Sequence, residues 1–341
     1  MIVTRSPLRI SLGGGGTDLP SYYKQYGGFL IAATINKHIY ISLAETFNDK
    51  FLIKYSSFEE TKTIKTLKHP LFREILKKFK IKTPLIITSH ADIPAGTGMG
   101  SSGAFAVTLI NALSIYTKKN FSKRQIAEMA CDIEINTLKE PIGKQDQYTA
   151  SYGGINSYEY KKNGKVIVKK IKISDLRTNT LKKKLAIFFT GYSRSSYEIL
   201  KKQNDKTINL DKKMLENLHM VKSFGYESKN IIEEGNLDDL GKLMHEHWIF
   251  KKKRSLNMTN NKINQYYNFA LKNGALGGKL IGAGGGGFLM FYCEDVNFLE
   301  KKLKKFNIKK LDFEFSGIGA EIISSNKTQS WIPIPLFNLF L

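Results

Sequence analysis

The hydrophobic pattern divides the chain into short segments with two different periods. Apolar residues recur at every second position from Phe29 to Ile35 and again from Ile39 to Leu43, which is typical of a β-strand. Similar alternation, or a short apolar run, predicts further strands. The predicted strands are 1–12, 29–43, 84–90, a pair around the turn at 163–164, 185–191, 286–292 and 311–316.

Other segments have the character of helices. Residues 104–116 form a largely apolar run without glycine or proline, which indicates a buried helix. A second helix begins after Ser122, because Gln125 three residues later completes a capping box. The predicted helices are 104–116, 122–138, 195–205, 208–233, 237–249, 260–273 and 294–306. Strands and helices that are mixed without strict alternation predict the α+β class.

The chain is long enough for more than one domain. Its 341 residues exceed the size at which a single hydrophobic core stops growing. A polar, lysine-rich stretch at 175–184 predicts the boundary, with residues 1–180 as an N-terminal domain and 181–326 as a C-terminal domain. The apolar tail 327–341 is too short to span a bilayer. We expect this tail to pack on a neighbouring surface.

The charge balance is strongly basic. Lysine and arginine outnumber aspartate and glutamate by 53 to 30, which gives a formal net charge of +23. This excess favours nucleic acid, a membrane surface or phosphorylated small molecules as partners, although many lysines only solvate a surface. No basic stripe has interleaved aromatic residues, and no apolar run reaches about 18 residues, so we expect neither nucleic-acid nor membrane binding. Two distant cysteines and no recognisable signal peptide predict a cytoplasmic location.

Glycines are concentrated in three loops, at 13–16, 96–103 and 282–287. Glycine permits positive φ and close approach of a ligand, and successive N–H groups in such turns form concave anion sites. The middle loop follows a predicted strand and opens a predicted helix, whose first N–H groups and dipole favour an anion. The alternative is an ordinary serine cap. The loop lacks the Gly-Lys-Ser/Thr ending of a Walker sequence, and the 282–287 loop is followed by a strand rather than a dinucleotide-binding helix.

Three motifs together resemble those of the GHMP kinases, the superfamily of galactokinase, homoserine kinase and mevalonate kinase. The motifs occur in the family's order and span residues 7–288. Their residues are Pro7, Arg9, Gly13, Thr17 and Asp18, then Pro94, Gly96, Gly98, Gly100, Ser101 and Ser102, then Lys279 and 282–288. The resemblance implies an N-terminal domain like ribosomal S5 domain 2, a ferredoxin-like C-terminal domain and a cleft between them. It also implies an enzyme that transfers a phosphoryl group from ATP to an alcohol, acting as a monomer or homodimer.

The same resemblance assigns the ATP, metal and catalytic residues. Glu134 and Ser102 match the magnesium ligands of the family, Asp146 its catalytic base, and Arg9 the basic residue beside that base. Each also has a plainer interpretation: Glu134 as a solvated helix carboxylate and Arg9 as a surface charge at a strand edge. The residues expected to bind ATP are Pro94, Gly96, Gly98, Gly100, Ser101, Ser102 and Gly103.

The first motif bears on the substrate. It lacks the Glu-His pair that precedes Thr-Asp in galactokinases, so galactose is not expected. Segments 11–23 and 190–196 look most like D-glycero-D-manno-heptose 7-phosphate kinases, which supply GDP-heptose for surface polysaccharides. Fucokinases, octose-phosphate kinases and non-catalytic GHMP regulators remain alternatives. The expected substrate-binding residues are Thr17, Asp18, Arg194, Gly284 and Gly285, although Asp18 could instead form a turn and Arg194 could pair with Glu198.

Overall fold

The computed structural model describes residues 1–191 and 196–325. The helices of this part are α1 Pro20–Tyr26, α2 Pro70–Lys78, α3 Ser101–Tyr116, α4 Lys123–Cys131, α5 Gln145–Tyr152, α6 Asp175–Lys184, α7 Tyr197–Ile208, α8 Lys212–Glu233, α9 Leu237–Lys252, α10 Asn261–Leu271 and α11 Val296–Leu303. The strands are β1 Ile2–Gly14, β2 Gly28–Glu45, β3 Phe51–Lys54, β4 Phe58–Thr61, β5 Leu85–Ala91, β6 Ile155–Tyr160, β7 Val166–Lys170, β8 Leu185–Phe189, β9 Ala275–Leu280, β10 Phe288–Cys293 and β11 Glu321–Ser325. The predicted mixture of helices and strands in two parts is confirmed.

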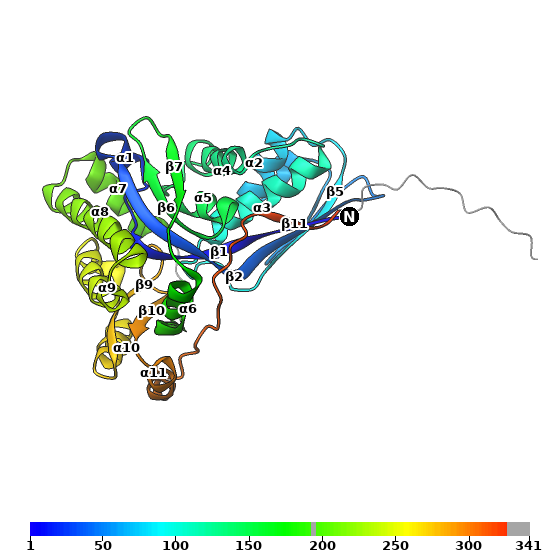
Figure 1. Cartoon of the computed structure of the whole chain (residues 1–341). Coiled ribbons are helices and arrows are strands. Elements are labelled where there is room, and N and C mark those ends of the chain that lie inside the picture. Colours follow the sequence, from blue (N-terminus) through cyan, green and yellow to red (C-terminus); the bar gives the residue numbers. More distant parts are fainter. Residues whose placement is uncertain (192–195, 326–341) are drawn as a thin grey trace, which may run out of the picture.

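The larger sheet is organised around β2. This long strand pairs along its length with β1, and its opposite edge pairs first with β6 and then with β5. The path of the sheet runs β11-β1-β2-β5-β3-β4, with β7 outside β6. In Figure 1, helices α3, α4 and α5 lie together on one side of this sheet. The middle glycine loop leads into α3, and the predicted base Asp146 lies on α5. Packing of these helices on the sheet therefore determines the positions of the loop and the base.

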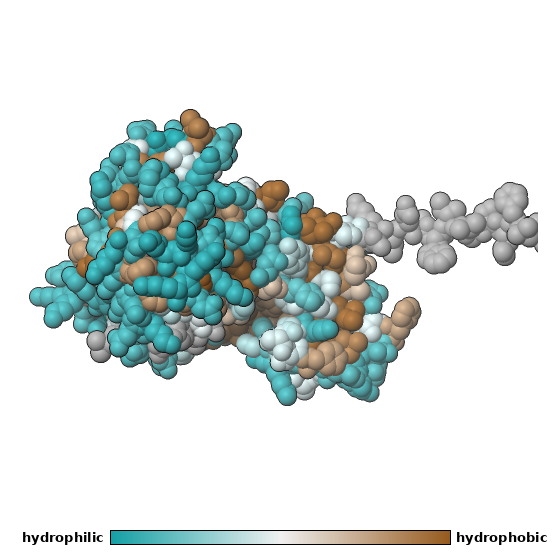
Figure 2. All heavy atoms as spheres, turned by 90° about the horizontal axis from the view of Figure 1, so that it is seen from below, coloured by the Kyte–Doolittle hydropathy of each residue, from teal (hydrophilic) through white to brown (hydrophobic). Residues whose placement is uncertain are grey.

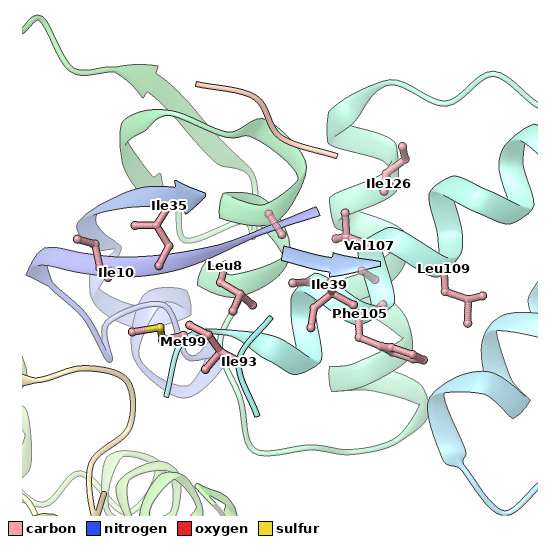
Figure 3. Close-up of a cluster of buried hydrophobic side chains, with 14 of the residues drawn as sticks. Leu8, Ile10, Ile35, Ile39, Ile93, Met99, Phe105, Val107, Leu109 and Ile126 are labelled. Atoms are coloured by element: carbon pink, nitrogen blue, oxygen red, sulfur yellow. The ribbon is translucent and has the colours of Figure 1, made fainter. Parts of the chain in front are cut away.

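A buried hydrophobic cluster fastens the glycine loop to the sheet. Figure 3 shows Leu8 and Ile10 of β1 pointing into this cluster beside Met99. Met99 is fully buried, although it lies between two glycines of the loop just before α3. Its carbonyl accepts a hydrogen bond of 3.1 Å from the N–H of Arg9. Burial of the Met99 side chain therefore anchors the middle of the loop to the core. The glycines on either side of Met99 line the cavity.

The C-terminal part is built on a smaller sheet of three strands in the described residues, in the order β8-β10-β9. Strand β10 is buried along its whole length, and helices α9, α10 and α11 pack against this sheet. Trp248 of α9 is fully buried in the resulting core. Helix α8 packs on both α9 and β1, so it connects the two parts of the molecule.

One predicted strand of the C-terminal part differs from the structure, and the predicted boundary stretch has a defined secondary structure. Segment 311–316 is not a strand: Lys310 forms an isolated bridge with Phe188, and Phe315 forms another with Ile35. The alternation of apolar residues there reflects burial, because the segment crosses from one sheet to the other and never forms a ladder. The lysine-rich stretch 175–184 is the helix α6, which Ser174 caps by accepting a hydrogen bond from the N–H of Arg177.

The strand β11 was not predicted from the sequence. It pairs antiparallel with the beginning of β1, with Ile2 opposite Ser325 and Arg5 opposite Glu321. The Arg5 guanidinium donates a hydrogen bond of 2.6 Å to the Glu321 carboxylate. The end of the segment assigned to the C-terminal domain therefore belongs to the N-terminal sheet.

The surface seen in Figure 2 is mostly hydrophilic, with apolar side chains in smaller groups. No helix within the described ranges is long and apolar enough to cross a bilayer. Two predictions, the packing of the tail 327–341 and the role of Arg194, fall outside the described residues.

Candidate active site

A cavity of about 840 Å³ lies where the two parts of the molecule meet. The N-terminal part contributes two glycine-rich loops to its lining, at 14–16 and 96–103, and the C-terminal part contributes the third, at 282–286. Strands of both sheets and the helices α3, α5 and α9 supply the side chains discussed below. The structure thus brings together the three glycine loops that the sequence singled out.

The middle glycine loop adopts a backbone that requires glycine. Gly96, Gly98 and Gly100 have φ values of 75°, 84° and 80°, in the left-handed region that other residues rarely adopt. A Cβ atom on Gly98 would also lie 2.5 Å from the carbonyl oxygen of Ile281. The middle loop therefore packs directly against the backbone of Ile281, the residue before the third glycine loop. Gly98 thus has a packing role in addition to its predicted role in nucleotide binding.

The loop ends at the N-terminus of α3, which faces the cavity. Gly100 is the N-cap, so no capping side chain covers the first N–H groups of this 16-residue helix. The Ser101 hydroxyl oxygen is buried and has no hydrogen-bond partner among the described residues. Ser101 and the next residue, Ser102, both line the cavity. Free backbone donors, an unpaired hydroxyl and the helix dipole make this end of α3 suitable for phosphate.

Glu134 is held below this helix start by a single turn of π-helix, Asp132–Thr137, that continues α4. Its carboxylate is 1% exposed and accepts hydrogen bonds from the Ser102 hydroxyl and from the Gln147 amide, the latter at 2.6 Å. Burial raises the pKa of Glu134 to about 7, although both hydrogen bonds act in the opposite direction. A solvated carboxylate, the plainer interpretation, is therefore wrong.

Arg9 and Asp146 form an ion pair at the cavity wall. The guanidinium donates to the Asp146 carboxylate from Nε at 2.8 Å and from Nη2 at 2.7 Å, and Nη1 donates to the Gly98 carbonyl at 2.5 Å. Arg9 is 6% exposed, whereas the Asp146 side chain is 30% exposed. A Cβ on Gly103 would lie 2.7 Å from the Cβ of Asp146, so the glycine lets α5 approach the start of α3. The Asp146 carboxylate is therefore oriented by Arg9 and open to a ligand.

Asp18 lies close to this pair and is 6% exposed. Its carboxylate accepts hydrogen bonds from the N–H groups of Gln145, at 3.0 Å, and Gly16, at 3.1 Å. Burial raises the pKa of Asp18, while the Gln145 hydrogen bond lowers it. A Cβ on Gly143 would lie 1.9 Å from the Asp18 carboxylate, which fixes this carboxylate against the start of α5.

Three other residues were predicted to bind the substrate: Thr17, Gly284 and Gly285. The Thr17 hydroxyl donates to the Phe29 carbonyl at 3.0 Å and accepts from the Phe29 N–H at 3.1 Å, so this fully buried group supports the turn rather than lining the cavity. Gly285 donates its N–H to the Met258 carbonyl at 2.9 Å. Gly284 does line the cavity, with φ of 115°.

Comparison with known proteins identifies the family. The model of the GHMP kinase N-terminal domain matches residues 63–154, and the model of the GHMP kinase C-terminal domain matches residues 229–309. A D-glycero-α-D-manno-heptose 7-phosphate kinase from Campylobacter jejuni is 30% identical over 335 residues, which cover 94% of this chain and 98% of that protein. This chain is a GHMP kinase.

More distant proteins are also similar to this chain. A D-glycero-D-manno-heptose 1-phosphate kinase from Bacteroides thetaiotaomicron has a TM-score of 0.78 at 24% identity, covering 95% of this chain and 99% of that chain. The bifunctional fucokinase/GDP-fucose pyrophosphorylase of Arabidopsis thaliana is 23% identical over 85% of this chain, which spans 29% of that protein. GHMP kinases are phosphotransferases that use ATP as the donor, and this chain is one of them.

Several residues of this GHMP kinase site are not predicted by the sequence. Gln147, which orients Glu134, had no signal beyond its position one residue after Asp146. Four basic side chains of the C-terminal part also line the cavity: His247, Lys251, Arg254 and Lys279. In the sequence, Lys279 is recognisable only as a motif residue, and Lys251 has no role assigned to it. The helical spacing of Met244, Trp248 and Lys251, at i, i+4 and i+7, does place this lysine on the buried face of α9.

Proposed function

We propose that this kinase phosphorylates D-glycero-D-manno-heptose 7-phosphate at its anomeric hydroxyl and forms the 1,7-bisphosphate. The observation that carries the proposal is the Arg9–Asp146 pair, which is open to the cavity beside the start of α3. The choice of sugar is supported by the similarity to the C. jejuni heptose 7-phosphate kinase. The activity of that relative is thus extended to this chain as a proposal.

In the proposed reaction, the anomeric oxygen attacks the γ-phosphorus of ATP. The bond between this phosphorus and the β,γ-bridging oxygen breaks, ADP leaves, and the hydroxyl proton passes to the Asp146 carboxylate. Arg9 orients this carboxylate, because its guanidinium donates to it through two nitrogens. Asp18 is placed to accept hydrogen bonds from the sugar hydroxyls. The free N–H groups of α3 and the Ser101 hydroxyl would bind the phosphates of ATP.

The two ends of the cavity differ in a way that suits this arrangement. Around α2 the lining is apolar and aromatic, with His69, Leu71 and Phe105, which suits a purine ring. In the C-terminal part the lining is basic. Helices α2 and α9 lie far apart in Figure 1. We therefore place the nucleotide base toward α2 and the sugar toward α9.

The residues at Glu134 fit a magnesium ion. Mg²⁺ is usually held by one or two carboxylates together with substrate phosphates, and here one buried carboxylate stands beside the Ser102 hydroxyl at the cavity. The described residues contain no group of three or more His, Cys, Asp or Glu side chains arranged to hold a metal by themselves. When bound with ATP, Mg²⁺ would be held by Ser102 and Glu134 and would neutralise charge on the phosphates.

Removing either proposed ligand should raise the magnesium requirement. We expect Glu134→Gln and Ser102→Ala to increase the Mg²⁺ concentration for half-maximal rate by about tenfold or more, because the ion loses an oxygen partner. The measurement is a Mg²⁺ titration of the initial rate at saturating ATP. The control is Glu128→Gln, whose parent carboxylate binds Lys144 and Tyr148 instead of facing the cavity. An unchanged titration in both test variants would refute the metal assignment.

A substrate panel tests the proposed reaction. ADP release is measured with the heptose 7-phosphate, the unphosphorylated heptose, fucose, galactose and mevalonate. We expect the highest kcat/KM with the heptose 7-phosphate, and the product should carry a new phosphate on the anomeric carbon by ³¹P and ¹³C NMR. A higher kcat/KM with fucose would assign the chain to the fucokinase branch instead.

A further inference from the structure

The C-terminal part presents a group of buried basic side chains to the cavity. Lys251 and His247 belong to α9, Arg254 follows this helix, and Lys279 belongs to β9. Their exposed fractions are 7%, 3%, 6% and 2%, respectively. Lysine and arginine are rarely buried to this extent without a charged partner. We call these four residues the basic cluster.

The basic cluster has no carboxylate partner within salt-bridge distance in the described ranges. The Lys251 ammonium donates to the carbonyls of Leu280, at 2.7 Å, and Gly282, at 2.5 Å. The Lys279 ammonium lies 3.2 Å from both the Leu12 carbonyl and the His247 Nδ1. None of these basic residues occurs among the observed ion pairs with aspartate or glutamate, although Asp18 acts on Arg254 from a greater distance.

The positive charge of the basic cluster is therefore not balanced by a directly paired carboxylate in the described residues. Burial lowers the pKa of Lys279 to about 7, that of Arg254 to about 10 and that of Lys251 well below its usual value, and the Arg254 charge acts in the same direction on both lysines. Burying like charges together without a counter-charge is costly in free energy. Their retention at a ligand cavity indicates an anion that completes the group when it binds.

The position of Arg254 indicates which anion this is. Its Nε donates to the Asn217 side chain at 2.7 Å, and Nη2 lies 3.4 Å from the Gly15 carbonyl. A Cβ on Gly16 would lie 2.6 Å from Nη1. Arg254 is thus fixed against the turn that carries Asp18, on the sugar side of the cavity. The phosphates of ATP have separate donors at the start of α3.

We propose that Lys251, Arg254 and Lys279 bind the phosphate monoester that the sugar substrate already carries. This inference rests on the proposed function, because it assumes that the acceptor is a sugar phosphate. The three cations would pair with the phosphate oxygens, and neutral His247 orients Lys279 by accepting from its ammonium. The cluster is built into the described structure, whereas Arg194, the residue suggested by the sequence, lies outside it.

The test compares two acceptors in three separate variants, Lys251→Met, Arg254→Met and Lys279→Met. The measured quantity is kcat/KM with heptose 7-phosphate divided by kcat/KM with unphosphorylated heptose. This ratio should be about 10- to 100-fold lower in each variant than in the parent, because a hydrogen bond between charged groups is removed. Lys253→Met is the matched control, since Lys253 is an exposed neighbour on the same segment. Testing three positions keeps the inference falsifiable if one variant fails to fold.

A thermal measurement separates phosphate binding from a purely structural role. In a buffer without polyvalent anions, the methionine variants should melt at or above the temperature of the parent, because an uncompensated charge has been removed. Inorganic phosphate should raise the melting temperature of the parent more than that of each variant. Lower melting temperatures in all three variants, with the acceptor ratio unchanged, would overturn the inference in favour of loop support.

The remaining outcomes distinguish the inference from the proposed function. Equal use of both acceptors by the parent would overturn the sugar-phosphate assignment and the inference with it. A strong preference in the parent that persists in all three variants would overturn the inference alone. Loss of the preference in Arg194→Ala, with no loss in the three cluster variants, would transfer the phosphate site to Arg194.

Discussion

Replacing Asp146 with asparagine should lower kcat by about 10²- to 10⁴-fold, the range expected when a positioned general base is lost. Asparagine has nearly the same size and can still accept from Arg9, so the geometry of the site should survive. What changes is the proton acceptor, since the amide cannot take the proton of the sugar hydroxyl. The affinity for ATP should change little, because Asp146 lies on α5 and the proposed phosphate donors lie on α3.

The experiment requires kcat from steady-state ADP release and the ATP dissociation constant from calorimetry. Asp239→Asn is a suitable control: Asp239 also lies in the first turn of a helix and also pairs with a basic side chain, Lys242, at 2.8 Å. This control should retain the parental rate. If Asp146→Asn remained within a few-fold of the parent, the base assignment would be wrong and the carboxylate would only hold Arg9.

Gly98→Ala should damage both stability and nucleotide binding. The new Cβ would stand 2.5 Å from the Ile281 carbonyl, at a residue with φ of 84°. Left-handed strain and overpacking together should lower the free energy of unfolding by about 2–5 kcal/mol. The Kd for ATP should rise about tenfold or more, because the loop must move and its N–H groups lose hydrogen bonds to charged oxygens.

Gly164→Ala separates the two causes. Gly164 has the same φ of 84°, but a Cβ there would meet nothing within 4 Å. Its substitution should cost only the left-handed strain, about 1–2 kcal/mol, and leave the Kd for ATP unchanged. Urea unfolding and calorimetric ATP titration provide both quantities. Equal losses of stability in the two variants would show that the contact between the glycine loops contributes nothing.

The sequence predicts the local part of this site better than the long-range part. The glycine loop before α3 is recognisable because its strand, turn and helix are contiguous, and each has a clear residue pattern. The Arg9–Asp146 pair joins residues 137 positions apart, so only the family resemblance could bring them together. Residues whose role depends on a distant partner, such as Thr17 with the Phe29 backbone, could not be assigned from spacing alone.

The missed elements have physical reasons. Strand β9 contains adjacent glycines, Gly277 and Gly278, which lower its strand propensity. Glycine is nevertheless required at position 277, since a Cβ on Gly277 would lie 1.9 Å from the Gly241 carbonyl oxygen in α9. Conversely, Leu311 and Phe315 alternate correctly but bond to different sheets, so their pattern predicted a strand that does not exist.

The pairing of β11 with β1 has a consequence for synthesis on the ribosome. Residues Ile2 to Arg5 find their partners on one edge of β1 only after residues 321–325 have been made. At about 5–20 residues per second, this edge remains unpaired for roughly 15–60 seconds. An open strand edge is a template for pairing with another chain. The newly made N-terminal sheet is therefore exposed to aggregation until β11 has been made, and truncated chains that end before β11 should retain that exposure permanently.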